Sequence, residues 1–403
     1  MMKCDVIVIG AGAAGLMCAI EAARRGRSVI VLEHGKPGRK VLASGGGRSN
    51  FTNLELGADN YLSENPAFTR SALAGFTPGD IIGFLESRGV PFAQKGNGQL
   101  FLKGSSRALL ELLLGKCREN GAAVITGINI KGFGKKAARF NVDTNKKVCF
   151  DSESLVVATG GLSYPELGAT DLGYRIASRF GLRITPLRPA LVPFTFAPEE
   201  AHRFSGLCGL SLQAEISCGG GKNKSKNKSK RTFTGDILFT HRGLSGPAAL
   251  QASLYWAPGE ELSIDLLPDA DIKGMFMKDR DRSVEMQNYL SGFLPRRLAL
   301  KWCGSFLSPS AKKPLRLHSQ RELESAAEAL HNWTFRPAGT EGYRTAEVTA
   351  GGVDTRELSS RTMECGKVPG LFFAGEVMDV TGQLGGYNLH WAWASGCAAG
   401  RYA

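Results

Sequence analysis

The chain has 403 residues, and its 50 lysines and arginines against 37 aspartates and glutamates give a formal net charge of +13. Hydrophobic residues make up 43% and charged residues 22%, which excludes a disordered chain or a small disulfide-stapled peptide. The nine cysteines include no C-x-x-C pair, and we find neither a secretory segment nor a long apolar run, so we expect a cytoplasmic protein with reduced thiols, without a membrane span or a metal site.

The first 33 residues have the pattern of a strand, a glycine turn, a helix and a second strand. Residues 5–9 and 28–32 are apolar and rich in β-branched side chains, and residues 13–25 are helix formers. Gly26 follows the helix where a C-terminal glycine is expected. This pattern predicts a βαβ unit in a buried parallel sheet.

The glycine turn between the first strand and the helix fits the dinucleotide fingerprint G-x-G-x-x-G. Gly10 permits the tight turn, Gly12 lets a pyrophosphate approach the backbone, and Gly15 lets the helix approach the strand. The free N–H groups of the helix, which begins with Ala13 and Ala14, face the phosphate in such a turn. Glu33 ends the second strand and can accept from ribose hydroxyls, so we predict a bound dinucleotide, either FAD or NAD.

Two later apolar strands also end in glycine. Residues 155–159 lead from Thr159 into Gly160, and residues 370–374 lead into Gly375 and Glu376. Ligands of parallel sheets lie beyond the carboxyl ends of the strands, so we expect these ends to meet at one ligand. An extended cofactor held at several strand ends favours resident FAD, with NAD(P)H as a transient reductant. Glu376 could accept from ribitol hydroxyls or serve as an acid at a helix N-terminus.

We therefore predict an α/β fold: a Rossmann-like FAD-binding domain made of residues 1–188 and 344–403, with an inserted unit at 189–343. In the insert, alternation at residues 210–216 indicates antiparallel strands, and residues 283–302 and 319–333 have helical patterns. We expect no internal repeat in the chain. We also expect no metal-binding role for two acidic pairs of the insert, Asp265 with Asp269 and Glu322 with Glu324.

A basic segment interrupts the inserted unit at Lys222–Arg231, which carries six positive charges and no acid. Such a segment is either a solvated loop or an arm that binds phosphates. The remaining charge is 44 minus 37, or +7, so the rest of the chain is basic as well. Ribosomal RNA is a candidate partner for this surface and arm.

Several longer motifs resemble those of one family, the YhiN-like flavoproteins, also called the BaiN/RdsA family. The resemblance covers much of the chain and is carried by residues 37–53, 235–247, 346–353, 373–379 and 385–389. It implies FAD bound by a two-segment Rossmann-like domain with an inserted β-barrel and helical unit. The family commonly has cysteine where this chain has Ser49, so a thiol has no part at that position here.

The glycine-rich stretch and the start of the last helix supply further candidates for cofactor contacts. Cations of the stretch could meet phosphate, an anionic substrate or only solvent, and the amides at the start of the last helix would stabilise negative charge on a reduced flavin. The candidates are Arg39, Lys40, Ser44, Gly45, Gly46, Arg48, Ser49, Asn50, Gly386, Tyr387 and Asn388.

The catalytic groups are unknown from the sequence, and His241 and Tyr387 are the weak candidates. His241 could donate a proton or be a structural histidine. Trp391 and Trp393 fit core packing better than stacking on a flavin. We expect an FAD-dependent oxidoreductase that uses NAD(P)H to reduce an activated C=C bond.

The resemblance implies several substrate classes, and the basic charge favours uracil in 23S ribosomal RNA, that is, rRNA modification to dihydrouridine. A small-molecule reductase or oxidase acting on a steroid enone or an amine would also fit the motifs. A flavin-holding RNA-binding or assembly factor without turnover would fit them as well.

Overall fold

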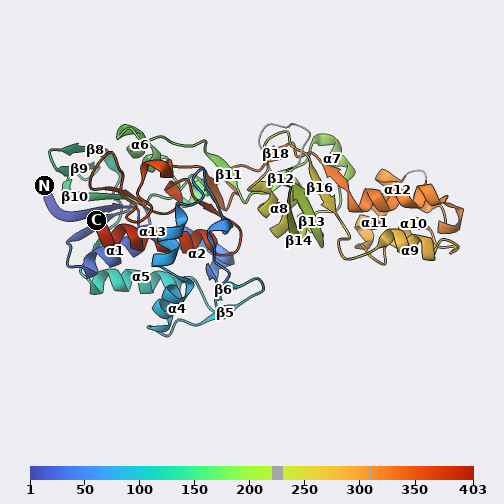
Figure 1. The fold of residues 1–403 in the computed structure, drawn as a ribbon, viewed down its shortest axis with the longest axis horizontal. Coiled ribbons are helices and arrows are strands. Elements are labelled where there is room, and N and C mark those ends of the chain that lie inside the picture. Colours follow the sequence, from blue (N-terminus) through green and yellow to red (C-terminus); the bar gives the residue numbers. More distant parts are fainter. Residues whose placement is uncertain (220–229, 308–309) are drawn as a thin grey trace. The chain divides into compact units, whose positions relative to one another are not determined.

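The computed structural model describes residues 1–219, 230–307 and 310–403. These residues form two compact units (Figure 1). The two-segment unit consists of Met1–Pro189 and Glu347–Ala403, and the inserted unit consists of Ala190–Ala346. Residues 222–229 of the expected basic arm lie outside the described residues, whereas Lys230 and Arg231 are described.

The two-segment unit is built on a seven-stranded sheet with strand order β7-β2-β1-β10-β9-β8, to which β20 is added beside β10. The predicted βαβ unit is confirmed by β1, α1 and β2, and β1 pairs in parallel with both β2 and β10. The strands are β1 (Met2–Ile9), β2 (Val29–Leu32), β7 (Ala123–Ile125), β8 (Ile130–Lys136), β9 (Arg139–Thr144), β10 (Cys149–Val157) and β20 (Leu371–Phe373).

One side of β10 is shared between two neighbours. Its first half pairs antiparallel with β9, and its second half pairs in parallel with β20 from the end of the chain. The sheet is therefore mixed: the predicted parallel pairing holds for β1, β2, β7, β10 and β20, whereas β8 and β9 add an antiparallel part that was not predicted. The β8–β9 hairpin causes the difference, because a tight link between consecutive strands makes them antiparallel.

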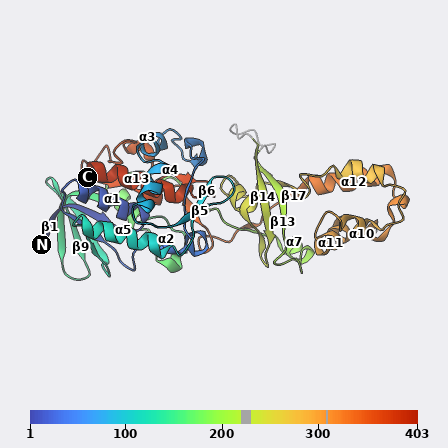
Figure 2. The same ribbon diagram turned by 90° about the horizontal axis from the view of Figure 1, so that it is seen from below.

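Helices α1 (Ala13–Arg24) and α13 (Tyr387–Tyr402) pack closely against each other, and Figure 2 shows them side by side with α5 (Arg107–Glu119). Two glycines make the approach of α13 possible. A Cβ atom at Gly396 would lie 2.3 Å from the carbonyl oxygen of Ala14, and one at Gly400 would lie 2.5 Å from that of Cys18. The C-terminal helix is thus seated on the helix that follows the glycine turn.

Both tryptophans of α13 belong to the core. Trp391 and Trp393 are buried, and their indole N–H groups donate to the carbonyl oxygens of Gly375 and Phe51 at 3.3 and 2.9 Å. These contacts account for the two side chains as packing residues, which is the role that the sequence favoured.

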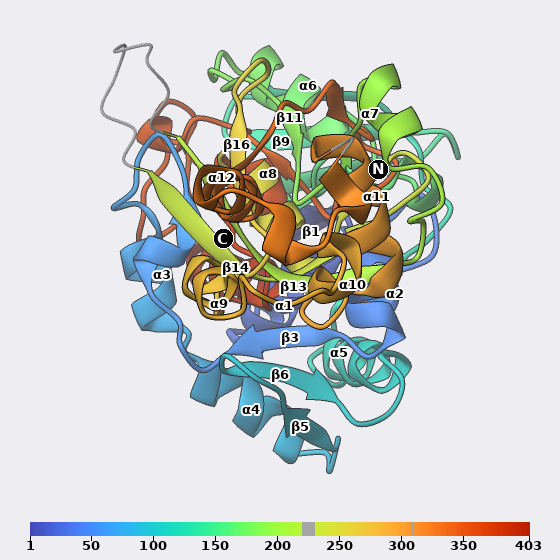
Figure 3. The ribbon, with the colours of Figure 1, turned by 90° about the vertical axis from the view of Figure 1, so that its right-hand side faces the viewer.

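Smaller elements complete the two-segment unit, and Figure 3 shows β3 and β6 side by side in a three-stranded sheet. The remaining helices are α2 (Arg39–Gly47), α3 (Thr69–Gly75), α4 (Pro78–Glu86) and α6 (Leu172–Arg179). The remaining strands are β3 (Asn50–Asn53), β4 (Tyr61–Leu62), β5 (Phe92–Gln94), β6 (Gln99–Leu102), β11 (Arg188–Ala190), β19 (Val348–Ala350) and β21 (Thr381–Gly382).

The inserted unit contains a seven-stranded antiparallel sheet with strand order β17-β16-β13-β14-β15-β12-β18. The strand order runs from β17 to β18 without a pairing between these two among the described residues, so the sheet is open where the resemblance implied a β-barrel. Strand β13 confirms the strand predicted from alternation. Helix α8 (Pro247–Ser253) packs on β13 and β14. The strands are β12 (Phe194–Thr195), β13 (Ser211–Cys218), β14 (Arg231–Phe239), β15 (Gly243–Ser245), β16 (Leu262–Asp265), β17 (Trp333–Phe335) and β18 (Gly339–Thr340).

The helical part of the inserted unit differs from the sequence prediction at one point. The helix predicted over residues 283–302 is two helices, α10 (Met286–Leu290) and α11 (Arg296–Phe306). Pro295 lies between them and stands at the N-cap of α11, because proline and the residue before it disfavour a continuous helix. The other helices are α7 (Pro198–Arg203), α9 (Ile272–Lys278) and α12 (Gln320–His331), and α12 was predicted.

No helix among the described residues is long and apolar enough to cross a membrane.

His390 of α13 is a buried histidine that is held in its neutral form. Its Nδ1 atom lies 2.7 Å from the hydroxyl oxygen of Thr52, and its Nε2 atom lies 2.9 Å from the carbonyl oxygen of Phe76. Burial lowers the pKa of His390 to about 4, against the opposing influence of the Phe76 carbonyl and Asp80. The imidazole therefore donates to Phe76 and accepts from Thr52.

This histidine predicts a pH-dependent stability. Below pH 6.5 the unfolded chain binds a proton at His390 that the folded chain excludes until the pH approaches about 4. We expect the free energy of unfolding to fall over this range by up to about 3 kcal/mol through this group. Denaturant titrations at pH 7 and pH 4.5 would measure the fall, which should be smaller in His390→Gln. The matched control is His241→Gln at an exposed position, and its free energy of unfolding should fall with pH as much as that of the unsubstituted protein. An equal fall in both variants would contradict the role assigned to His390.

Candidate cofactor site

Three glycine-bounded strand ends meet at one edge of the central sheet. Ile9 is paired with Val157, and Val157 with Phe373, so β1, β10 and β20 end in register. The chain continues from these ends into Gly10, into Thr159 and Gly160, and into Gly375 and Glu376. The predicted meeting of strand ends that lie 148 (157 − 9) and 216 (373 − 157) positions apart in the sequence is thus a feature of the sheet.

The glycines of the fingerprint, together with Gly160 after β10, fall into two kinds. A Cβ atom at Gly10 would lie 2.5 Å from the carbonyl oxygen of Ala158, and one at Gly15 would lie 1.9 Å from that of Gly10. At Gly12 and Gly160, by contrast, no atom lies within 4 Å of such a Cβ atom. Gly10 and Gly15 are therefore required for backbone packing, whereas Gly12 and Gly160 border open space. This space fits a pyrophosphate that approaches the backbone.

The N-terminus of α1 is available to an anion. Gly12 is its N-cap residue with extended backbone angles (φ −83°, ψ −170°), no side chain caps the helix, and the first turn, which begins with Ala13 and Ala14, contains no acidic residue. The N–H groups of the first turn lack carbonyl partners within the helix. Together with the helix dipole they favour a phosphate at this position.

Glu33 closes the second strand beside the glycine turn and is buried. Its two carboxylate oxygens accept from the backbone N–H groups of Ala11 and Gly35 at 2.9 and 2.8 Å. The guanidinium of Arg39 lies 3.6 Å from the same carboxylate and 2.8 Å from Nε2 of His34. The acid is thus fixed at the strand end, with a cation of the glycine-rich stretch next to it.

Lys40 and Glu376, which are both predicted site residues, form an ion pair of 2.7 Å across 336 positions of sequence. The other carboxylate oxygen of Glu376 accepts from the hydroxyl of Ser163 and the N–H of Thr349, both at 2.9 Å. Ser163 and Thr349 were missed by sequence reasoning. Their positions gave a signal, since Ser163 follows the Gly160–Gly161 turn and Thr349 lies in one of the family motifs.

The glycine-rich stretch forms α2 and the turn that follows it. Gly45, Gly46 and Gly47 have φ values of 57°, 64° and 82°, and the buried Ser49 has a φ value of 45°. Ser44 donates to the carbonyl oxygen of Val41 at 2.8 Å, and its hydroxyl lies 3.3 Å from that of Ser49. The three glycines are needed for this left-handed path. Arg48 is exposed at the end of α2.

The start of α13 is tied to the surrounding loops by side chains that we predicted to contact the cofactor. The amide of Asn388 both accepts from the N–H and donates to the carbonyl of Gly382, each at 2.8 Å. The side-chain oxygen of Asn50, in its favourable orientation, accepts from the N–H of Gly386 at 3.2 Å. Asn388 therefore positions the helix start.

The two catalytic candidates lie in different units. Tyr387 is largely buried and donates to the carbonyl of Glu55 at 3.4 Å, and burial raises the pKa of its hydroxyl. His241 is exposed in the turn between β14 and β15 of the inserted unit. Within the two-segment unit, the structure brings together Glu33 and Arg39, Lys40 and Glu376, and Ser44 and Ser49.

A second pair near the strand ends also escaped sequence reasoning. Tyr164 has a left-handed backbone, with a φ value of 58°, directly before Pro165. Burial is the main cause that raises the pKa of Tyr164 to about 12, and the negative charge of Glu347 and a hydrogen bond to Glu347 add to the effect. Desolvation likewise raises the pKa of Glu347, against the charge of Lys40. The pair is therefore part of the polar surroundings of Lys40.

Comparisons with known proteins agree with this geometry. A family profile described as "HI0933-like protein Rossmann domain" matches residues 4–402. The chain belongs to the HI0933-like family. Its fold is accordingly the Rossmann-like α/β fold predicted above, and the resemblance to the YhiN-like flavoproteins is confirmed.

Several relatives match the HI0933-like chain over nearly its full length. The "Ribosomal RNA dihydrouridine synthase" of Escherichia coli K12 is 45% identical over 403 residues, which is 99% of this chain and 97% of the relative. The "3-dehydro-bile acid delta(4,6)-reductase" of Clostridium scindens is 30% identical over 416 residues, which is 98% of each chain. Both names denote enzymes.

Among solved structures, one titled "Quinol-Fumarate Reductase with Menaquinol Molecules" has a TM-score of 0.51 at 14% identity, and the match covers 99% of this chain and 70% of that one. This similarity concerns the fold alone.

Proposed function

We propose that this HI0933-like protein is an FAD-dependent oxidoreductase that reduces uracil in 23S ribosomal RNA to dihydrouridine with NAD(P)H as the electron source. The observation that carries the proposal is the 45% identity, over almost the whole of both chains, to a relative named ribosomal RNA dihydrouridine synthase. The open glycine turn at the strand ends supports a dinucleotide cofactor. The proposed activity requires the protein to work in the cytoplasm.

The residues at the strand ends fit FAD. The N–H groups of the first turn of α1 would hold its pyrophosphate above Gly12, and Glu33 would face the adenosine ribose. Glu376, fixed by Lys40, Ser163 and Thr349, would orient the ribitol chain. The N-terminus of α13 would stabilise negative charge near the pyrimidine edge. When bound, FAD supplies hydride transfer between a nicotinamide and the acceptor.

The charge of the chain supports a polyanionic substrate. A formal net charge of +13 favours nucleic acid, and phosphate contacts give affinity that falls as the salt concentration rises. A target uracil must leave its stack to reach the cofactor, which costs least in a single-stranded or loop region.

The decisive experiment measures dihydrouridine in 23S ribosomal RNA. We expect the modification to be absent from cells that lack the gene, and to return on complementation with the intact gene but not with a Gly12→Val variant. Mass spectrometry of nuclease digests detects the added mass of two hydrogens. Unchanged dihydrouridine in the deleted cells would contradict the proposed substrate.

A small-molecule reductase is the second candidate, and the observation that favours it is the full-length similarity to a bile acid reductase. Such an enzyme would turn over a soluble enone and would not respond to ribosomal RNA. A passive RNA-binding factor would differ from both enzymes, because NADH and NADPH would fail to bleach its bound flavin under anaerobic conditions.

A further inference from the structure

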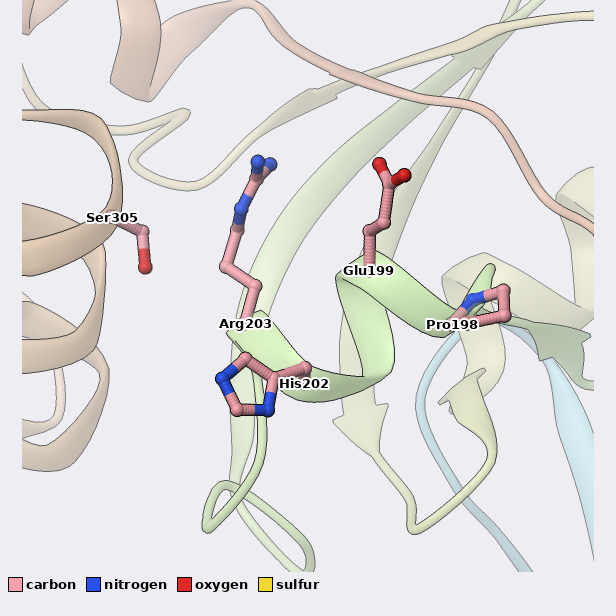
Figure 4. Close-up of a pocket in the computed structure, with 5 residues that line it drawn as sticks. All are labelled: Pro198, Glu199, His202, Arg203 and Ser305. Atoms are coloured by element: carbon pink, nitrogen blue, oxygen red, sulfur yellow. The ribbon is translucent and has the colours of Figure 1, made fainter.

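The inserted unit has a cluster of cations on α7 and α11. These helices belong to a different part of the chain from the glycine-lined strand ends. We call this cluster the α7–α11 basic face, and it consists of His202, Arg203, Arg296, Arg297 and Lys301. All but the half-buried Lys301 are exposed. An open pocket on this face is lined by Pro198, Glu199, His202, Arg203 and Ser305 (Figure 4).

The amphipathic pattern of α11 determines which of its residues face outward. Leu298, Ala299, Trp302 and Cys303 are buried in the core of the inserted unit. Arg296, Arg297, Leu300 and Lys301 therefore lie on the other side of the helix, one turn apart. Phe293, just before the helix, is 37% exposed, and Leu300 is 39% exposed. The outer side of α11 thus combines cations with apolar surface.

Protein contacts hold several of these cations in place without neutralising them. Arg297 donates to the carbonyl oxygen of Gly206 at 3.2 Å, and Lys301 donates to the hydroxyl of Ser205 at 3.3 Å. The guanidinium of Arg203 lies 5.1 Å from the centre of the Phe306 ring, and Figure 4 shows its side chain extending beside the helix that carries Ser305. These partners are neutral, so the positive charge remains available to an anion.

The rest of the helical part contains both paired and unpaired cations, and among the described residues Arg280, Arg316 and Arg321 are exposed and form no ion pair. There Lys273 pairs with Glu324 at 3.2 Å, and Lys313 pairs with Glu322 at 3.1 Å. On the α7–α11 basic face, the acidic residues Glu199 and Glu200 lie on α7, and neither comes within ion-pair distance of the cations in the described part of the chain. Burial raises the pKa of Glu200, against the influence of Arg203. The α7–α11 basic face differs from these other cations in lying beside an open pocket and beside the exposed side chains of Phe293 and Leu300.

We propose that the α7–α11 basic face binds the sugar-phosphate backbone of the ribosomal RNA substrate, with Arg296, Arg297 and Lys301 contacting phosphates. The arginine forks suit phosphate oxygens. The exposed Phe293 offers a surface on which an unpaired base can stack. This inference rests on the proposed function and adds the surface that holds the substrate.

The test neutralises this face while leaving the cofactor site unchanged. The face variant combines Arg296→Gln, Arg297→Gln and Lys301→Gln, which lowers the net charge from +13 by 3 to +10. The control variant, Arg280→Gln with Arg316→Gln and Arg321→Gln, makes the same change at exposed cations elsewhere in the helical part. Binding of unmodified 23S ribosomal RNA, made by transcription, is measured over a salt range of roughly 50 to 300 mM, where phosphate contacts give a measurable slope.

We expect the face variant to bind RNA about ten-fold or more weakly at low salt, with a salt slope smaller by about 2 to 3, and the control to change little. Replacing the two arginines by lysine should restore most of the binding. Binding of the face variant with the affinity and slope of the unsubstituted protein would overturn the inference, as would equal losses in both variants. Flavin content and anaerobic reduction by NADPH should be the same in all of them.

The two proposals can fail separately. If the unsubstituted protein binds this RNA through the face but forms no dihydrouridine in it, the proposed reaction fails and the inferred surface stands. If dihydrouridine forms at the usual rate in the face variant at limiting RNA, the reaction stands and the surface is wrong.

Discussion

The variant Gly12→Val is expected to fold normally and to be purified without flavin. Gly12 has an extended backbone that valine can adopt, and no protein atom lies within 4 Å of a Cβ atom at this position. The added side chain would occupy only the space that we assign to the pyrophosphate. Loss of the close backbone approach should reduce FAD affinity by at least about a hundred-fold, that is, by about 3 kcal/mol or more.

The measurements are the visible absorbance of the purified protein and the uptake of added FAD by fluorescence quenching, with circular dichroism to verify folding. Gly104→Val is the matched control, because Gly104 is exposed and likewise has no atom within 4 Å of an added Cβ atom. It should retain flavin. If Gly12→Val binds FAD as tightly as the control, the cofactor does not cross this turn, and the proposed site is wrong.

The variant Gly396→Ala is expected to destabilise the two-segment unit strongly. A single Cβ atom at this position would lie 2.3 Å from the carbonyl oxygen of Ala14, and both partners belong to helix backbones that cannot rotate away. Helices α1 and α13 must therefore separate, which costs about 3 kcal/mol in a closely packed core. The shift also moves the N-termini of the two helices that border the cofactor site.

Helix propensity alone predicts that replacing glycine by alanine raises stability, which is the opposite of the change expected at Gly396. Alanine is preferred over glycine in an exposed helix by about 1 kcal/mol, so Gly83→Ala in α4, where no atom lies within 4 Å, should be neutral or stabilising. Thermal unfolding of both variants, recorded with and without added FAD, measures the difference. A melting temperature of Gly396→Ala at or above that of Gly83→Ala would contradict the close packing of α1 and α13.

The sequence predicted the elements whose signals are local. The glycine fingerprint, the β-branched strands and Gly26 after the helix lie within 33 residues, and β1, α1 and β2 follow them closely. The prediction of a single helix over 283–302 failed because the apolar periodicity continues across Pro295, where the backbone cannot remain helical. The β8–β9 hairpin was not predicted, although it changes the sheet from parallel to mixed.

The candidate site shows the same division between local and distant information. Gly10, Gly12, Gly15 and Glu33 are close in the chain, and their roles follow from the geometry of one turn. The partners of Glu376 could not be predicted, since Lys40 and Ser163 are distant in sequence and hydroxyl groups occur throughout the chain. The two hydrogen bonds between the side chain of Asn388 and Gly382 could not be predicted either, because the two residues belong to different elements.

The sequence by itself determined the βαβ unit, the class of cofactor turn and the membership of a flavoprotein-like family, because these depend on residue types at short, regular spacings. Only the tertiary structure decided that Lys40 neutralises Glu376, that Gly396 is required for helix contact, and that the cations of α11 lie next to α7 and the turn after it. Such features depend on distances between segments brought together by burial of the core, and no spacing along the chain encodes those distances directly.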